Sequence, residues 1–168
     1  MGRSVAGNGL LEVSLTRRIP ASPEAVFRAW TDANQLAAWC GPKGYTSSSC
    51  TVDARVGGVL RMEMCSPDGE VCPMSGRFVE VDRPHRLVFV TAALDGAGEP
   101  VFEVRNTGTF MAVDGGTEIS LVAEMTSTAP EAPLHLSGLT QGWSQSLDRL
   151  VALVARDRRV SMAQTEAG

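Results

Sequence analysis

The chain has 168 residues, of which 43% are hydrophobic and 20% are charged, and its formal net charge is −4. This length and composition are typical of one globular domain with a core of its own. The acidic balance argues against nucleic-acid binding, and no apolar run reaches the roughly 20 residues of a membrane span. Residues 1–9 lack the apolar core of a secretory signal, so we expect a disordered tail there and a cytoplasmic protein.

The first predicted elements are one strand and two short helices. Apolar and polar residues alternate over 11–19, which is the pattern of a strand with one buried face. The Ser-Pro-Glu sequence at 22–24 predicts a helix start, because serine caps the first turn and proline fits its first position. A second short helix is predicted from Asp32 or Asn34, and it ends before Gly41-Pro42.

The middle of the chain predicts six strands joined by short turns. Connections of hairpin length join antiparallel neighbours, so we expect an antiparallel sheet. Asp-Gly at 68–69 is a preferred hairpin turn, and Asp-Gly-Gly at 114–116 marks another. The predicted strands cover 45–55, 59–65, 71–81, 87–94, 101–113 and 117–126.

The last hairpin predicts which face of the sheet is buried. With the two glycines at 115–116 as its loop, Phe110 lies opposite Leu121, and Gly108 lies opposite Ala123. This face is almost wholly apolar, whereas the other face is polar, so the apolar face is predicted to point inward. Small residues in the middle of the inward face leave two interpretations open, which are close packing and a cavity.

The hairpin at 68–69 predicts a second inward face, on which Leu60, Met62 and Met64 lie together. The same register places Arg77 on that face. Methionine adapts to irregular partners, so such a face suits variable ligands as well as a packed core.

The four cysteines have no spacing typical of a zinc site. The register of the 68–69 hairpin places Cys65 opposite Cys72, with Cα atoms about 5.5 Å apart, which permits a disulfide. A cytosolic protein normally keeps its thiols reduced, so the default is four free thiols, and the sequence does not decide whether this pair is joined.

A long helix is predicted over Pro133–Arg156, because its large apolar residues recur every three or four positions. Beside them, Gly138, Gly142 and Ser146 form a ridge of small residues. Glycine disfavours helices, so this ridge indicates either a close backbone approach or empty space beside the helix. We expect the rest of the chain to be a curved sheet wrapped over this helix.

The sequence carries no standard catalytic or cofactor motif: it has no glycine-rich phosphate loop, no HExxH and no GxSxG. His85 and His135 have no partner suggested by spacing. We therefore predict no catalytic residue, no metal site and no cofactor, and we lean toward a role other than catalysis.

The order and spacing of several short segments carry a family resemblance. The segments are 18–27, 29–32, 36–42, 56–58, 67–69, 76–81, 84–89, 142–143 and 147–150. Together they resemble the AHSA1-like (activator of Hsp90 ATPase homologue) branch of the SRPBCC, or START-like, superfamily, from about Leu10 to Val154. The resemblance implies an α+β helix-grip fold of the START/Bet v 1-like kind. It consists of a seven-stranded antiparallel sheet around a long C-terminal helix, with two short helices after the first strand and a cavity between sheet and helix.

We therefore expect a single domain of this kind over 10–156, and we predict a disordered tail at 157–168. A cavity of this kind predicts an apolar wall with two residues at its mouth. The predicted wall consists of Leu60, Met62, Met64, Phe89, Gly108, Phe110, Trp143 and Leu147, and the predicted mouth consists of Trp39 and Tyr45.

One fold hosts many functions, so the resemblance leaves several open. The first is binding of a hydrophobic small molecule, such as a lipid or polyketide. Relatives in enediyne producers imply a sharper version, antibiotic self-resistance in an actinobacterium by sequestration or by self-sacrificing cleavage, with Gly76 or Gly108 as hydrogen donor. The alternatives are a polyketide cyclase or aromatase and an Hsp90 co-chaperone-like interaction domain. The sequence does not indicate the oligomeric state.

Overall fold

A computed structural model describes residues 2–5, 10–41, 43–94, 97, 100–126 and 140–155. Eight strands form one antiparallel sheet in the order β1-β2-β8-β7-β6-β5-β4-β3. The strands are β1 (Gly2–Val5), β2 (Leu10–Ile19), β3 (Thr46–Val52), β4 (Val59–Cys65), β5 (Val71–Asp82), β6 (Arg86–Leu94), β7 (Pro100–Val113) and β8 (Gly116–Thr126).

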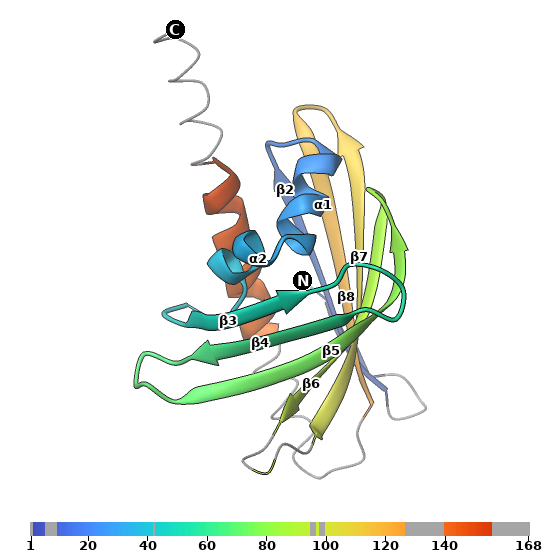
Figure 1. The fold of residues 1–168 in the computed structure, drawn as a ribbon. Coiled ribbons are helices and arrows are strands. Elements are labelled where there is room, and N and C mark those ends of the chain that lie inside the picture. The colour runs from blue at the N-terminus through green and yellow to red at the C-terminus, as the bar shows by residue number, and fades with distance from the viewer. Residues whose placement is uncertain are drawn as a thin grey trace, which may run out of the picture.

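The sheet curves around three helices (Figure 1). Two of them, α1 (Pro23–Thr31) and α2 (Ala33–Trp39), follow β2 directly, and the third covers 140–155. Strands β2–β8 and these helices form the predicted helix-grip fold, which is thereby confirmed. The start of the predicted long helix, with Gly138, and the predicted tail at 157–168 lie outside the described residues. No helix in the described part of the chain is long and apolar enough to cross a membrane.

The N-terminal segment differs from the prediction. Residues Gly2–Val5 form β1, which pairs with β2 from Gly2 opposite Ser14 to Val5 opposite Leu11. The predicted disorder over 1–9 is therefore wrong for this strand. The reason is tertiary: an edge strand presents unpaired backbone N–H and C=O groups that another segment can pair with. A four-residue strand without apolar alternation leaves no pattern in the sequence.

The helix starts follow from the capping residues that the sequence indicates. The Ser22 hydroxyl accepts a hydrogen bond from the Ala25 amide at 3.2 Å, and Pro23 occupies the first turn. Asp32 ends α1 and caps α2, because its carboxylate accepts from the amides of Asn34 and Gln35 at 2.9 and 3.1 Å. Capping of this kind satisfies amides that have no partner within the helix.

The last hairpin keeps the predicted face but not the predicted register. Its turn is Asp114-Gly115, with Gly115 at φ +85°, and Phe110 lies opposite Ile119. The prediction that Phe110 faces Leu121 is wrong by two residues, and a shift of two leaves every side chain on the same face. Gly116 belongs to β8, where a Cβ would overlap the carbonyl of Ile19.

The β4–β5 hairpin is shifted by one residue from the prediction. Its turn is Pro67-Asp68-Gly69, closed by the Ser66 amide donating to the Glu70 carbonyl at 2.9 Å. Met62 therefore lies opposite Met74, where the prediction had Ser75. A shift of one moves every partner to the other face. Arg77, predicted to point inward, is consequently exposed on the outer face.

The same shift separates the predicted cysteine pair. Cys65 lies opposite Val71, and Cys72 lies opposite Met64. All four cysteines are free thiols in the structure.

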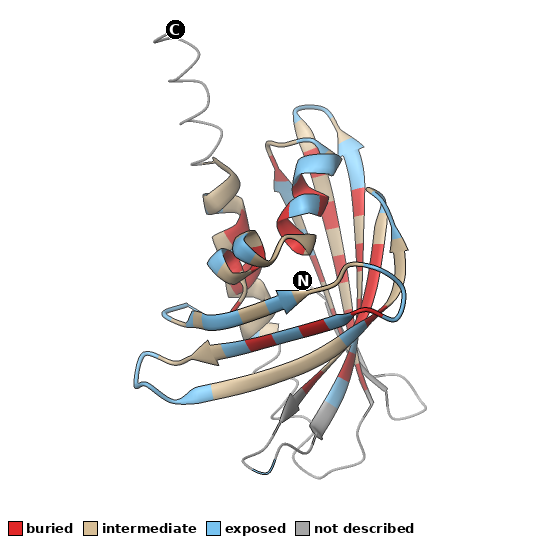
Figure 2. Cartoon of the chain, viewed as in Figure 1, coloured by how far each residue is buried: buried red, intermediate tan, exposed pale blue. Residues whose placement is uncertain are grey.

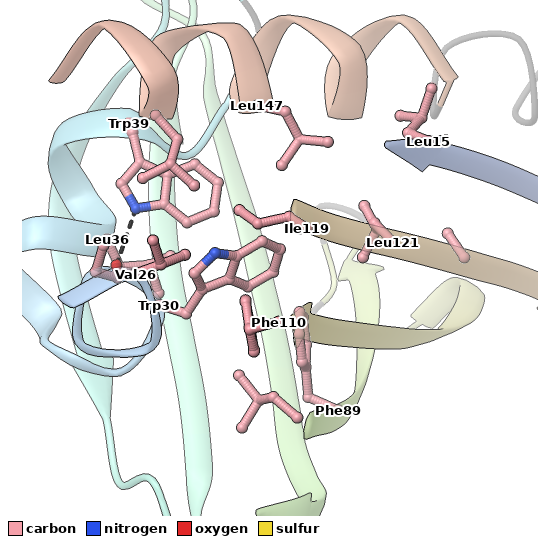
Figure 3. Packing of buried hydrophobic residues seen from close by; sticks show 14 of the residues in the cluster. Leu15, Val26, Trp30, Leu36, Trp39, Phe89, Phe110, Ile119, Leu121 and Leu147 are labelled. Atoms are coloured by element: carbon pink, nitrogen blue, oxygen red, sulfur yellow. Dashed lines mark hydrogen bonds between the residues drawn. The ribbon is translucent and has the colours of Figure 1, made fainter. Parts of the chain in front are cut away.

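The core lies between the concave side of the sheet and the helices (Figure 2). Alternate residues of β7 and β8 are buried, in agreement with the period of a strand. Figure 3 shows Leu147 of the C-terminal helix directed toward Ile119 and Leu121 of β8. The helix therefore covers the β2–β8 half of the sheet.

Candidate ligand-binding face

The side of the sheet that faces the helices, here called the inner face, is set by strand register. Leu60 and Met62 of β4, Phe89 of β6 and Phe110 of β7 all point to it. The prediction that Leu60, Met62 and Met64 share one face agrees with this register. Because strands alternate, every second residue on β2–β8 contributes to the same surface, except where bulges interrupt β3 and β5.

One half of the inner face is closed by the C-terminal helix and α1. Val13 and Leu15 of β2, with Leu121 and Ala123 of β8, are 2% exposed or less. Near them Arg17 donates to the Asp148 carboxylate at 2.9 Å, which ties β2 to the helix.

The other half remains partly accessible. Several inner-face residues on β3–β6 are only half-buried, and so is the helix residue that lies above Phe89. Five of these residues define what is here called the accessible patch: Cys50, Met64, Met74, Thr91 and Trp143. Inward-pointing side chains that keep contact with solvent mark the place where a small molecule could reach the inner face.

An aromatic cluster borders the accessible patch, and Trp30 of α1 is its centre. Trp30 stacks on Trp143 with centroids 5.6 Å apart and planes at 16°. Its ring also meets Phe89 at 6.1 Å and Phe110 at 5.6 Å, both edge to face. Offset and edge-to-face pairs are the favourable geometries for aromatic rings. Sequence reasoning named the three partners as cavity wall but missed Trp30, since its helical face indicated only core packing.

The predicted wall residues are brought together, although most are covered. Leu60, Met62 and Leu147 are 3% exposed or less, and only Met64 and Trp143 belong to the accessible patch. A Cβ at Gly108 would lie 3.4 Å from Cζ of Phe110, so that ring covers the glycine. Close packing, one of the two interpretations left open, therefore holds at this position.

The two predicted mouth residues, Trp39 and Tyr45, differ in how far they are buried. Trp39 is 0% exposed, and its Nε1 donates to the Ala29 carbonyl at 2.9 Å (Figure 3). Its placement at a mouth is therefore wrong, because the turn from α1 to α2 folds its ring under Trp30. Tyr45 is half-buried beside Gly41, where it stays a candidate for the edge of the accessible patch.

Ser146, one of the small residues of the ridge on the C-terminal helix, packs against the loop after α2. The Ser146 hydroxyl accepts from the Gly41 amide at 2.9 Å and donates to the Gly142 carbonyl at 2.8 Å. Arg149 donates to the carbonyls of Gly41 and Ala38 at 3.1 and 3.2 Å. A small side chain at this position lets the loop after α2 approach the helix closely, so close backbone approach, one of the two interpretations left open, holds at Ser146.

Two thiols lie near this loop. Burial, and then the neighbouring Cys50, raise the pKa of the Cys40 thiol to about 12, although the Arg149 guanidinium acts in the opposite direction. Burial, and then the charge of Asp32, raise the pKa of the Cys50 thiol. Thiolate is the reactive form of cysteine, so neither residue has the environment of a nucleophile.

The inner face offers little acid–base chemistry. Among its described residues on β2–β8, the register places no carboxylate and no histidine. The described residues also contain no group of three or more His, Cys, Asp or Glu side chains that could hold a metal ion. The polar groups on this face include Thr91 and Asn106, which are hydrogen-bonded to each other.

Comparison with known proteins places these features in context. The family model described as "Activator of Hsp90 ATPase homolog 1-like protein" matches residues 20–155. A solved structure from Chromobacterium violaceum is 32% identical, covers 85% of this chain and 96% of its own, and has a TM-score of 0.71. One from Nitrosomonas europaea is 28% identical, with coverages of 87% and 95% and a TM-score of 0.74. One from Mycobacterium smegmatis is 25% identical, with coverages of 92% and 96% and a TM-score of 0.74. No curated protein matches the chain.

Proposed function

The chain belongs to the activator of Hsp90 ATPase homolog 1-like family, and on that premise we propose that it binds a hydrophobic small molecule at the accessible patch. The observation that carries this proposal is the partial exposure of inward-pointing side chains on β3–β6. A fully packed sheet would bury them, as β2 and β8 do. The methionines and Trp143 supply adaptable apolar area, which suits a ligand without a dense set of polar groups.

Binding accounts for the site better than catalysis does. General acid–base catalysis requires a titratable group within hydrogen-bond reach of the substrate. The described inner face of β2–β8 carries no carboxylate or histidine for this purpose. A cyclase or aromatase role therefore has less support than binding without reaction.

Antibiotic sequestration is the sharper version of the same proposal, since polyketides are large and apolar. Cleavage of the backbone by a bound enediyne has less support at Gly108, because the ring of Phe110 covers this residue. Sequestration requires only the accessible patch and no reactive glycine.

An NMR titration tests the proposal. We expect a neutral probe such as N-phenyl-1-naphthylamine to shift the methyl signals of Met64 and Met74 and the indole signal of Trp143. The methyl of Met111, which is 58% exposed on the outer face of β7, should stay in place as an internal control. The proposal fails if the Met111 signal shifts as much as the signals of the accessible patch. It also fails if no signal shifts with lipid, polyketide or naphthyl probes.

A further inference from the structure

A polar side chain lies fully buried in the middle of the inner face. Asn106 of β7 is 0% exposed and lies between Phe89 of β6 and Ala123 of β8. Its Nδ2 donates to the Thr91 hydroxyl at 3.1 Å and to the carbonyls of Phe89 and Val104, both at 3.3 Å. Its Oδ1 is buried and has no hydrogen-bond partner within the described part of the chain.

The chemistry of the partners fixes which way this amide points. Two of the three partners of Nδ2 are backbone carbonyls, which can only accept hydrogen bonds. Rotating the amide by 180° would set Oδ1 against these oxygens, and neither atom could donate. The NH₂ group therefore stays on the strand side, and the acceptor Oδ1 faces away from these carbonyls.

A buried acceptor without a donor is costly, so an asparagine at this position calls for a partner. The neighbouring residues indicate where that partner comes from. Thr91, which holds the amide, is half-buried and belongs to the accessible patch. Asn106 is therefore buried directly beside Thr91, a residue of the surface that we propose as the ligand-binding site.

A second buried polar atom lies in the same region. Trp30 Nε1 has no hydrogen-bond partner among the described residues, and the Trp30 ring contacts Phe89, the residue opposite Asn106 (Figure 3). The interior around Phe89 thus holds one unpaired acceptor and one unpaired donor. A hydroxyl group both donates and accepts, so it is a chemical group that suits such surroundings.

We infer that Asn106 Oδ1 accepts a hydrogen bond from a hydroxyl or N–H group of the bound molecule, so that the site selects aromatic ligands with a donor group, such as phenols. This inference rests on the proposed function, because it assigns the polar contact of the same site. The accessible patch supplies apolar contact area, and Asn106 discriminates between ligands with and without a hydrogen-bond donor. A site built to bond a hydroxyl rejects the analogue that lacks it, because the protein group then stays unpaired.

Three matched probes test the inference: 2-naphthol, which carries the donor, 2-methoxynaphthalene, which carries oxygen without the donor, and naphthalene. Calorimetric titration should show that the wild-type protein binds 2-naphthol at least tenfold more tightly than either of the others. In Asn106→Leu this preference should vanish. Thr107→Val is the matched control, since Thr107 is the next residue of β7 but lies on the outer face, and this variant should keep the preference for 2-naphthol.

The outcomes separate the inference from the proposed function. If the three probes bind the wild-type protein equally, Oδ1 is satisfied by something other than the ligand, such as a bound water, and the inference is overturned while the binding function stands. If no apolar probe binds, both are overturned. Should Asn106→Leu fail to fold, the side-chain carbonyl of Asn106 in the wild-type protein provides a second readout. Its ¹³C signal should shift with 2-naphthol and not with 2-methoxynaphthalene, and an equal response to both would contradict the inference.

Discussion

Replacing Ser146 by alanine tests whether the C-terminal helix is fixed by the loop after α2. Ser146 is 3% exposed, and its hydroxyl accepts a hydrogen bond from the buried Gly41 amide at 2.9 Å. Alanine removes the acceptor, leaves that N–H without its partner and opens little space. A buried polar group deprived of its partner costs about 1–3 kcal/mol. Alanine is a better helix former than serine and returns a few tenths of a kcal/mol, so we expect a net loss of about 1–2 kcal/mol.

The assay is urea unfolding followed by tryptophan fluorescence, with a thermal melt beside it. For a chain of this size, a loss of about 1–2 kcal/mol lowers the melting temperature by about 2–8 °C. Gln145→Ala is the matched control on the same helix, because it removes an exposed hydrogen bond from the Lys43 amide to Oε1 at 2.8 Å. Exposed groups find water when they lose a partner, so the control should lose less than about 0.5 kcal/mol. Equal effects of the two variants would refute the argument that the buried Gly41–Ser146 contact fixes the helix.

Two further predictions concern backbone packing and thiol chemistry. Gly76→Ala should destabilise the protein by about 1–3 kcal/mol in the same unfolding assay, because a Cβ would overlap the Val90 carbonyl and the strand backbone would have to shift. Gly69→Ala is the control, because a Cβ there meets nothing within 4 Å, although φ is +87°. This control measures only the cost of the backbone conformation, and its loss of stability should be smaller than that of Gly76→Ala. Cys40 should stay unmodified by iodoacetamide at pH 8 in the folded protein and react after unfolding, since a pKa of about 12 leaves about one thiol in ten thousand ionised at that pH. Rapid labelling of folded Cys40, read by peptide mass, would contradict the raised pKa of this thiol.

The sequence predicts the fold well where the signal is local. The caps at Ser22 and Asp32 define two helices, and the alternation in β7 and β8 identifies the inner face. These features depend on residues close together in the chain, so the sequence alone carries them. The family resemblance adds that the sheet surrounds the last helix, which the structure confirms (Figure 1).

Strand register is less predictable, because it depends on which residues the turn uses. Asp-Gly-Gly at 114–116 contains two possible two-residue turns, and Asp-Gly at 68–69 belongs to a turn that also includes Pro67. The first ambiguity shifts the register by two residues, so every side chain of β7 and β8 stays on the predicted face. The second shifts it by one, which separates Cys65 from Cys72 and turns Arg77 outward.

The candidate site was only partly predictable. Phe89 and Trp143 were named from their apolar character, and the structure brings both to Trp30. The link between Gly41 and Ser146 joins residues 105 positions apart, and no local pattern encodes such a contact. Asn106 was missed because a single polar residue on an apolar face gives no motif, although its place opposite Phe89 makes it the most informative polar group of the inner face.

The most direct test of the account compares the affinity for a neutral apolar dye of two variants, one with a charge on the inner face of the sheet and one with a charge on the outer face. Met74→Glu introduces a carboxylate into the accessible patch, and Met111→Glu introduces the same group on the outer face of β7, where Met111 is 58% exposed. Fluorescence titration with N-phenyl-1-naphthylamine should show that Met74→Glu weakens binding at least tenfold, because a ligand would have to desolvate the charge. Met111→Glu should bind as the wild-type protein does. Equal affinity of the two variants would contradict the claim that the inner face over β3–β6 is the binding site.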